Sequence, residues 1–327
     1  MQRVTLLLPA AARFGEQGLR DIAARALGRS DRITHDSAGR RAQLLRYFKL
    51  VPNHWPIAAL TRQTDAVAED AGLSAWLRAD PAYVQPDING ARLLACGDML
   101  NLADADSAAL LPALKPVFGD VGFPIDAPTP SRWYLRVPRE SKLPAFTDPE
   151  TALGDDLFEH LAEGSDGRRW RALLSEAQVV LHNHPWNAQR IAQGKLPVNS
   201  LWFWGGGVLP DAVRTLQAAV CSNEETARAL AYAAKRDPVD AGSRNDSVAV
   251  DRLTPGFVAK PGNSLFDLHA ERDLARLQHD WLQPAVHTMQ RRELDSLHLD
   301  FADGTVFTIK PSQRWRFWRR PLTRLNP

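Results

Sequence analysis

Cysteine is scarce in this sequence, in which Cys96 and Cys221 are the only two among 327 residues. Each lies in an apolar run with no second cysteine or histidine at a metal-binding spacing, which excludes a disulfide framework and a cysteine-based metal site. We expect both side chains to be reduced and buried. A long uncharged hydrophobic run is also missing, and the apolar start at residues 4–8 is too short for a signal peptide. The sequence therefore predicts a cytoplasmic protein with no membrane partner.

An excess of charge of one sign is the second absence. The 40 lysine and arginine residues are nearly balanced by 38 aspartate and glutamate residues, so the net charge is +2. This balance gives no global reason to expect nucleic acid as a partner. Neither Gly-x-x-x-x-Gly-Lys-Ser/Thr nor Gly-x-Gly-x-x-Gly occurs, which excludes the two common glycine-rich nucleotide-binding loops. Any ligand site has to be found locally.

The pattern of apolar residues predicts an α/β fold, with mixed sheet layers flanked by helices and a C-terminal β-hairpin. Residues 4–8 form a short apolar run typical of a strand buried on both faces. Residues 297–309 alternate around Asp303-Gly304, and residues 83–96 do so around Asn89-Gly90, so each stretch predicts a hairpin. Helical spacing is expected at residues 19–27, from Leu44 to near Pro52, from Ile57 onward, at 170–181 and from Phe266 to Trp281.

The prolines and glycine between residues 140 and 154 suggest the boundary between two regions. We therefore predict an N-terminal α/β region at residues 1–145 that contains a strand-strand-helix-strand unit. A C-terminal α/β region would follow at residues 146–327, with the histidine- and tryptophan-rich stretch 181–207 and the closing hairpin.

The stretch 181–207 is the richest in chemistry-bearing side chains. His184, Asn187 and Arg190 are spaced three apart, so a short helix after Pro185 would present an imidazole, an amide and a guanidinium on one face. Such a face suits a phosphate or a carboxylate. The structural alternative is that Asn187 and Arg190 cap neighbouring backbone and His184 is an internally satisfied histidine.

Other features of the sequence have two interpretations as well. His182 and His184 have no acidic or cysteine ligand nearby, so we expect no metal there. Gly205, Gly206 and Gly207 either expose backbone N–H groups to an anion after a strand or form a tight turn that allows close packing. A face made of His269, Asp273, Arg276 and Asp280 is expected to be solvated rather than catalytic.

The C-terminal sequence interleaves arginines with aromatic residues between Arg314 and Arg320. This alternation of cations and aromatic rings is compatible with stacking on nucleic acid. Because no wider basic field supports that function, we expect instead that the aromatic side chains are buried in the core and the arginines are solvated.

A family resemblance enters through the stretch His184-Pro185-x-Asn187-x-x-Arg190-x-x-x-Gly194-x-x-Pro197-x-Asn199-Ser200-Leu201-Trp202-x-Trp204-Gly205. It resembles a segment of the archaeal-type cofactor-independent phosphoglycerate mutases, which belong to the alkaline phosphatase superfamily. More of the chain resembles the RpfE-type regulatory proteins of proteobacteria. That likeness includes Arg78-Ala79-Asp80-Pro81, Trp133-Tyr134-Leu135-Arg136 and Phe317-Trp318-Arg319-Arg320. The resemblance and the glycines together imply substrate-binding roles for His184, Asn187, Arg190, Asn199, Trp202, Gly205 and Gly206.

The departures from the mutase pattern concern the metal centre. The resemblance implies metal-binding aspartates directly after the first strand, whereas Leu8 is followed by Pro9-Ala10-Ala11-Ala12-Arg13. It also implies a serine nucleophile and a C-terminal cluster of aspartates and histidines, which the sequence does not reveal. We therefore expect a mutase-like protein without a metal cofactor that binds a small anionic ligand, and a protein partner, in a regulatory role. The alternative is a manganese-dependent mutase or phosphatase whose ligands are hidden in the sequence.

Overall fold

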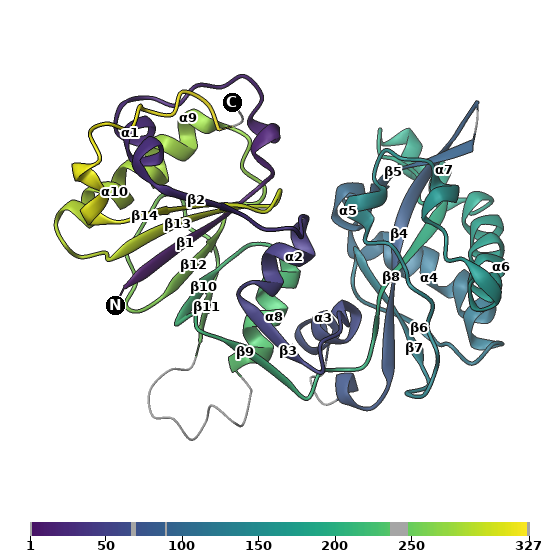
Figure 1. Ribbon diagram of the computed structural model, residues 1–327. Coiled ribbons are helices and arrows are strands. Elements are labelled where there is room, and N and C mark those ends of the chain that lie inside the picture. Colours follow the sequence, from purple (N-terminus) through teal and green to yellow (C-terminus); the bar gives the residue numbers. More distant parts are fainter. Residues whose placement is uncertain (1, 67–69, 89, 236–247, 326–327) are drawn as a thin grey trace. The chain divides into compact units, whose positions relative to one another are not determined.

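The computed structural model describes residues 2–66, 70–88, 90–235 and 248–325 of the chain. The chain forms two compact units (Figure 1). Unit 1 comprises Met1–Asn53 and Asp211–Pro327, and unit 2 comprises His54–Pro210, so unit 2 is inserted into the sequence of unit 1. Asn89 of the predicted turn lies outside the described residues.

Unit 1 is built on a seven-stranded sheet in the order β11-β10-β12-β1-β13-β14-β2. The central strand β1 pairs in parallel with β12 and β13, so that Leu6 lies between Phe266 and Leu299. Residues 4–8 are buried, as predicted. β13 and β14 form the predicted hairpin. The strands are β11 (Ala249–Asp251), β10 (Ala219–Cys221), β12 (Ser264–Asp267), β1 (Arg3–Leu8), β13 (Ser296–Phe301), β14 (Thr305–Ile309) and β2 (Asp31–Thr34).

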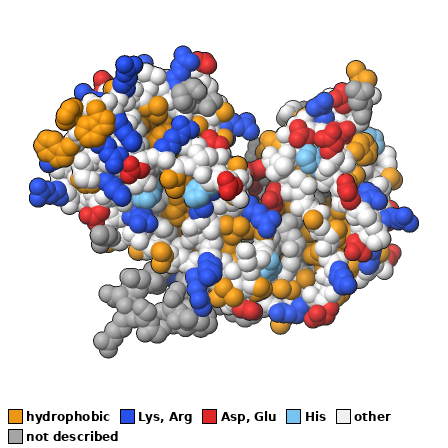
Figure 2. Space-filling view, in the orientation of Figure 1, with side chains coloured by type: hydrophobic (Ala, Val, Ile, Leu, Met, Phe, Trp, Pro, Cys, Tyr) orange, Lys and Arg blue, Asp and Glu red, His pale blue; other side chains and the backbone are white. Residues whose placement is uncertain are grey.

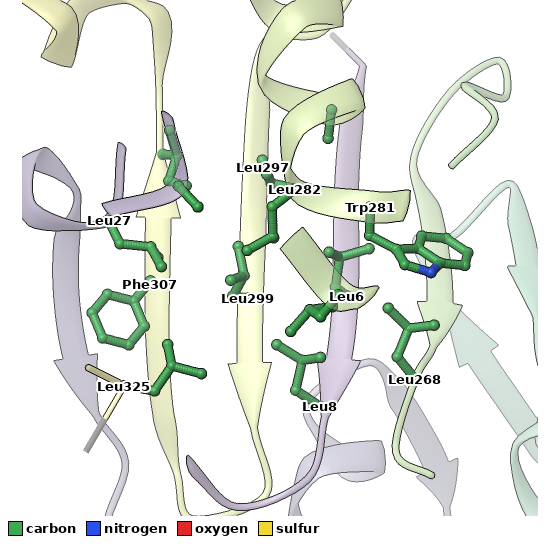
Figure 3. Packing of buried hydrophobic residues seen from close by; sticks show 14 of the residues in the cluster. Leu6, Leu8, Leu27, Leu268, Trp281, Leu282, Leu297, Leu299, Phe307 and Leu325 are labelled. Carbon is green, nitrogen blue, oxygen red and sulfur yellow. The ribbon is translucent and has the colours of Figure 1, made fainter. Parts of the chain in front are cut away.

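Helices cover this sheet because their apolar faces match its alternating side chains. In Figure 3, Leu27 of α1 (Asp21–Arg29) and Leu282 lie over Leu6, Leu299 and Phe307 of the strands. Leu282 closes the π-helical turn η6 (Gln278–Leu282), which joins α9 (Leu274–Leu277) to α10 (Gln283–Gln290). The helix α8 (Glu225–Lys235) contacts β10 and β11. A separate antiparallel pair joins β3 (Phe48–Val51) to β9 (Ala212–Thr215), and α2 (Arg40–Leu45) precedes β3.

Unit 2 is organised around one long strand, β4 (Ala75–Asp87). It pairs in antiparallel fashion with β5 (Gly90–Cys96), β7 (Arg132–Val137) and β8 (Ser200–Gly207), and β6 (Ile125–Thr129) pairs with β7. Neighbouring residues of a strand point to opposite faces. Trp76 and Tyr134 accordingly pack with α3 (Ile57–Asp65). Leu77 and Leu135 join the core on the other face, which includes α4 (Asp104–Gly119) and α6 (Gly164–His182).

The remaining elements of unit 2 complete this two-sided burial. Its other helices are α4 (Asp104–Gly119), α5 (Pro149–Ala152), α6 (Gly164–His182) and α7 (Trp186–Ala192). In the described part of the chain, short 3-10 turns lie at Ala11–Phe14, Asp70–Gly72, Gly97–Leu100, Leu157–His160 and Pro311–Trp315. The chain is therefore an α/β protein with mixed sheets flanked by helices, as the sequence predicts. No helix in the described ranges has the length and apolar character needed to cross a membrane.

The division into units differs from the predicted boundary at residue 145. That position lies inside unit 2, in the irregular stretch between β7 and α5. Leu143 and Phe146 pack on the same core as α4 and α6, and the indole N–H of Trp202 donates to the carbonyl oxygen of Thr147 at 2.9 Å. Contacts on both sides of the stretch therefore join it to one unit, although its prolines suggest a linker.

Two predicted helices are partly wrong. The second helix ends at Leu45, and Phe48–Val51 is a strand because Phe48 and Leu50 are buried while the residues between and after them are exposed. The first eighty residues therefore hold more strand than expected. Phe266 likewise belongs to β12, and the helix begins only after Asp273, whose side chain accepts from the N–H groups of Ala275 and Arg276.

Two smaller expectations also fail. Gly205, Gly206 and Gly207 are the last residues of β8 rather than a turn after it. At the C-terminus, Trp315, Phe317 and Trp318 are 65%, 78% and 69% exposed rather than buried in the core.

The arginines explain the orientation of this C-terminal segment. Arg316 Nη1 donates to the carbonyl oxygen of Arg29 at 3.1 Å and to Asp31 Oδ1 at 2.6 Å. Arg319 Nη1 donates to the carbonyl oxygen of Ser30 at 2.6 Å. Because the two guanidinium groups satisfy backbone oxygens of unit 1, the aromatic side chains between them are left on the outer side.

Candidate functional site

The predicted anion-binding residues lie in unit 2, where the chain passes from α6 through α7 into β8. Asn187 and Arg190 lie on α7 and are 5% and 1% exposed, respectively. His182 is exposed at the end of α6, and His184 is half-buried in the following turn. The helix after Pro185 forms as predicted, but His184 lies before it; Asn187 and Arg190 on the helix face inward.

Asn187 uses its whole amide group on the protein's own backbone. Its Nδ2 donates to the carbonyl oxygens of Leu181 and Val198, both at 2.8 Å, and its Oδ1 accepts from the N–H of Val198 at 2.9 Å. The amide therefore joins the end of α6 to the start of β8. This is the structural alternative that the sequence left open.

Arg190 has an internal oxygen beside each guanidinium nitrogen. Nε donates to the carbonyl oxygen of Leu196 at 2.9 Å, and Nη2 donates to that of Leu100 at 2.8 Å. Nη1 lies 2.8 Å from Oδ2 of Asp106 on α4. The side chain thus links three segments of unit 2, and its charge is balanced by a buried carboxylate.

Asp106 is the centre of this arrangement. Its Oδ1 accepts from the indole N–H of Trp186 at 2.7 Å, and its Oδ2 accepts from the backbone N–H of Ala103 at 2.8 Å. Burial raises the pKa of Asp106, but the hydrogen bonds from Ala103, Trp186 and Arg190 lower it more, so the net shift is downward. Asp106 therefore stays ionised opposite Arg190.

The other predicted residues also have structural contacts. The N–H of Trp186 donates to Nδ1 of His184 at 3.2 Å. Asn199 pairs with the backbone of Val84, since its Oδ1 accepts from the N–H at 2.8 Å and its Nδ2 donates to the carbonyl oxygen at 2.7 Å. The amide of Asn199 therefore extends the pairing of β8 with β4 by one step.

Trp202 and the glycines belong to the packing of β8. The indole ring of Trp202 is buried, and its N–H bonds the loop before α5. Gly205 has φ of +63°, and a Cβ there would lie 3.1 Å from Cβ of Ile57 on α3. A Cβ on Gly206 would lie 2.7 Å from a methyl carbon of Leu143. These glycines allow a helix and a loop to approach the strand closely.

Unit 2 also contains a buried ion pair that local spacing does not predict. Arg78 donates to Asp80 through Nε and Nη2, each at 2.8 Å, and both residues are buried. The indole N–H of Trp204 donates to Asp80 Oδ2 at 2.7 Å. Burial raises the pKa of Asp80, although Arg78 opposes this shift. Two opposite charges inside an apolar strand were the available signal.

A second polar cluster lies in unit 1, at the carboxyl ends of parallel strands, where ligands bind in α/β folds. Arg40 Nη2 lies 2.5 Å from Oδ2 of Asp267, the last residue of β12, and 3.2 Å from Oε2 of Glu224. The hydroxyl of Ser222, just after β10, donates to the same Asp267 oxygen at 2.7 Å. We call Arg40, Ser222, Glu224 and Asp267 the edge cluster.

Asp300 of β13 is held in a similar way next to the edge cluster. Arg46 pairs with both of its carboxylate oxygens, Nε lying 2.8 Å from Oδ2, and the hydroxyl of Tyr47 donates to Oδ2 at 2.7 Å. Burial and the Asp300 carboxylate raise the pKa of Tyr47, which keeps it protonated as a donor. Gln43 Nε2 donates to the carbonyl oxygens of Leu8 and Asp300.

These contacts define what the carboxyl edge can do chemically. Each buried carboxylate faces a guanidinium group, and Ser222 donates to a carboxylate that is already paired. Burial lowers the pKa of Arg40, but Asp267 and Glu224 raise it more, so the guanidinium remains charged. The described residues contain no group of three or more potential ligands arranged to hold a metal ion. In the edge cluster, the buried carboxylate of Asp267 is thus already paired with a cation of the protein itself.

Spacing along the chain does not predict the edge cluster, because its members are separated by up to 227 positions. Asp267 was assigned to a helix rather than to the end of a strand. Once β12 is recognised as a strand, a carboxylate at its carboxyl end is the signal that could have found the site.

Comparison with known proteins gives a local match in sequence. Over 111 residues the chain is 32% identical to a probable 2,3-bisphosphoglycerate-independent phosphoglycerate mutase of Geobacter sulfurreducens. This match covers 34% of the chain and 28% of that protein. Part of the chain resembles cofactor-independent phosphoglycerate mutases. The mutase of Methanosarcina mazei is 39% identical over 64 residues, which are 20% of this chain and 16% of that enzyme.

The mutase-like segment is therefore short, since it spans less than a third of either relative. No protein-family model matches the chain. Two solved structures are similar over most of their length. A cofactor-independent phosphoglycerate mutase of Thermoplasma acidophilum has a TM-score of 0.39 at 14% identity, covering 94% of this chain and 89% of that one. The PH0037 protein of Pyrococcus horikoshii has a TM-score of 0.47 at 10% identity, covering 98% and 90%. These values are too low to carry an argument about function.

Proposed function

We propose that this chain is a phosphoglycerate-mutase-like protein of the RpfE type that lacks a two-metal catalytic centre. In this proposal it binds a small phosphorylated or carboxylated molecule and acts in regulation rather than in catalysis. The observation that carries the non-catalytic part is the position of Arg40, whose guanidinium lies between Asp267 and Glu224 in the edge cluster.

The argument rests on charge. Metal-assisted phosphoryl transfer uses divalent cations to neutralise the charge that develops on the phosphoryl oxygens, and carboxylates hold those cations. In the edge cluster the neutralising charge is a guanidinium group, which bonds two carboxylates but cannot coordinate a phosphoryl oxygen as a Lewis acid. Asp300 is paired with Arg46 in the same way. Among the residues that the structure describes, these carboxylates therefore do not fit a pair of divalent metals.

The direct test measures metal and activity together. The metal content of the purified protein is determined, manganese and then 3-phosphoglycerate are titrated by calorimetry, and interconversion of 3- and 2-phosphoglycerate is assayed with manganese. The Methanosarcina mazei mutase serves as the positive control. We expect no tight stoichiometric manganese and no manganese-dependent conversion. Tight metal together with turnover would overturn the proposal in favour of a metal-dependent mutase or phosphatase.

A variant sharpens the test. Arg40→Ala leaves the 2% exposed side chain of Asp267 without its cation, so it should lower the melting temperature, and manganese should restore part of the loss. Arg13→Ala, at an exposed arginine of unit 1 outside the edge cluster, is the control. Stabilisation of the unaltered protein by manganese to the same extent would contradict the assignment of Arg40 as the neutralising group.

A further inference from the structure

A groove of about 640 Å³ lies in unit 1, away from the edge cluster. Its walls are α1, α10 and the segment from the end of β14 to Trp315. Pockets of roughly 300–1,000 Å³ are typical of small-molecule sites. The groove therefore has the size of a site for one small molecule.

The charge of the groove has a single sign. Five of its lining residues are cations and none is an aspartate or a glutamate, within the part of the chain that the structure describes. The cations are Arg25, Arg29, Arg292, Lys310 and Arg314. This is a strong local bias in a chain whose total charge is only +2.

Two of these cations, Arg29 and Arg314, contact neutral groups that leave their charges available. Arg29 Nη1 donates to a neutral group, the carbonyl oxygen of Arg314, at 2.9 Å. The guanidinium of Arg314 lies 4.8 Å from the ring centroid of Trp315. Asp31 is a nearby carboxylate, and the hydrogen bond from Arg316 lowers its pKa, as does the charge of Lys310. Asp31 is therefore ionised and paired with Arg316, and it offsets part of the charge of Lys310 but not those of the groove arginines. The groove thus attracts an anion that the protein does not itself supply.

The floor of the groove is apolar. It is lined by Ile22 and Ala26 from α1, Val286 and Met289 from α10, and Ile309 from β14. Inorganic phosphate or phosphoglycerate has no apolar part to cover such a floor. A ligand that buries apolar surface on the floor and also bonds to the cations needs an anionic group joined to an apolar or aromatic body.

Trp315 adds an aromatic surface at the groove and is largely exposed. Arg316, the next residue, is anchored to Arg29 and Asp31. Figure 2 shows hydrophobic side chains among lysine and arginine side chains on the part of unit 1 where this segment runs in Figure 1. An exposed ring beside cations is suited to stacking on a flat anionic ligand.

We propose that this groove binds a small anion with an aromatic or apolar body, such as a nucleotide or a fatty-acyl anion. The inference rests on the proposed function, because it names the site and the ligand class of the regulatory module. The cations bind the phosphate or carboxylate, and Trp315 and the floor cover the body. The motif of unit 2 is not part of this site.

The experiment uses the fluorescent probe anilinonaphthalene sulfonate, which joins an aromatic body to an anionic group. We expect saturable binding of one probe per chain, weakened by added salt because charges contribute. Arg25→Gln combined with Arg292→Gln should weaken binding about tenfold. Ala26→Trp, which fills the groove and keeps every cation, should abolish binding. Arg252→Gln, an exposed arginine of unit 1 outside the groove, should leave it unchanged.

Folding is monitored for every variant by near-ultraviolet circular dichroism, because a loosened core would also bind the probe. Unchanged binding by natively folded Ala26→Trp and by the double arginine variant would overturn the inference. That result can be told apart from failure of the proposed function. The proposed function is tested by manganese binding and mutase turnover, whereas this inference is tested by binding of the probe.

Competition identifies the source of the ligand. Displacement of the probe by AMP indicates a nucleotide-like ligand, and displacement by decanoate indicates a fatty-acyl anion. Displacement by neither, or equal displacement by 3-phosphoglycerate, would overturn the ligand class. Salt-sensitive binding of a single-stranded oligonucleotide that is lost in Phe317→Ala with Trp318→Ala, but kept in Ala26→Trp, would overturn it in favour of nucleic acid.

Discussion

Arg190 provides the sharpest test of how unit 2 is held together. Replacing it with alanine removes the cation opposite Asp106 and the donors to the carbonyl oxygens of Leu100 and Leu196. The side chain is only 1% exposed, so water cannot replace these interactions without opening the fold. The variant should therefore be destabilised whether or not any ligand is present.

The magnitude follows from the burial of both charges. Removing one partner of a buried ion pair costs about 3–5 kcal/mol, out of a typical domain stability of about 5–15 kcal/mol. For a unit of this size that loss lowers the melting temperature by roughly 6–20 °C. Part of the cost is the unpaired carboxylate of Asp106. The double variant Arg190→Ala with Asp106→Asn should consequently lose less than the sum of the two single variants, by about 1–3 kcal/mol.

Urea unfolding followed by circular dichroism measures these free energies. Arg168→Ala, an exposed arginine on α6, is the matched control and should stay within about 0.5 kcal/mol of the unaltered protein. The reasoning is refuted if Arg190→Ala is as stable as Arg168→Ala. If such a stable variant also lost binding of 3-phosphoglycerate, the anion-binding interpretation of Arg190 would replace the structural one.

Three further predictions concern unit 1. Burial, aided by nearby cations, lowers the pKa of His298 from 6.5 to about 4, so the unfolded chain binds this proton at higher pH than the folded protein. The free energy of unfolding should therefore fall as the pH drops from 6.5 towards 4. In urea unfolding, His298→Gln should reduce this pH-dependent loss by roughly 1–2 kcal/mol. A variant whose stability depends on pH as that of the unaltered protein does would contradict this assignment. A Cβ on Gly28 would lie 2.2 Å from a carbonyl oxygen of the C-terminal segment, so Gly28→Ala should speed proteolysis of that segment despite the higher helix propensity of alanine. Gly119→Ala, which meets nothing within 4 Å, should not, and equal cleavage of the two would contradict the packing. Phe317→Ser with Trp318→Ser should change the free energy of unfolding by less than about 0.5 kcal/mol, whereas a larger loss in urea unfolding would mean that these rings are buried.

The elements predicted correctly are those whose pattern is decided over a few residues. The run at residues 4–8 is apolar except for Thr5, and it forms the central strand β1. The alternation around Asp303-Gly304 gave the hairpin of β13 and β14. Phe48 and Phe266 were assigned to helices because a few apolar residues fit either period, and only pairing with β9 and β1 decides for the strand.

The predicted site shows the limit of local spacing. The three-residue intervals correctly predicted a short helix carrying Asn187 and Arg190, but not which way that helix faces. Asp106 lies more than eighty positions away from Arg190, and its carboxylate is the charge that draws the guanidinium inward. The same holds for the C-terminal segment. Arg316 and Arg319 donate to backbone oxygens just before β2, and the rings of Phe317 and Trp318 between them remain exposed.

By itself the sequence determined the α/β class, the central buried strand and the closing hairpin, since apolar periodicity and turn residues act locally. Only the tertiary structure decided which polar side chains bond to other groups of the protein and which face solvent. Arg40, Arg190 and Arg25 are the same residue type in one chain, and their environments differ. Arg40 pairs with carboxylates at the carboxyl edge of a sheet, Arg190 is buried against Asp106, and Arg25 lines a cationic groove. The physical reason is that the use of a charge depends on partners brought together by folding, which spacing along the chain does not encode.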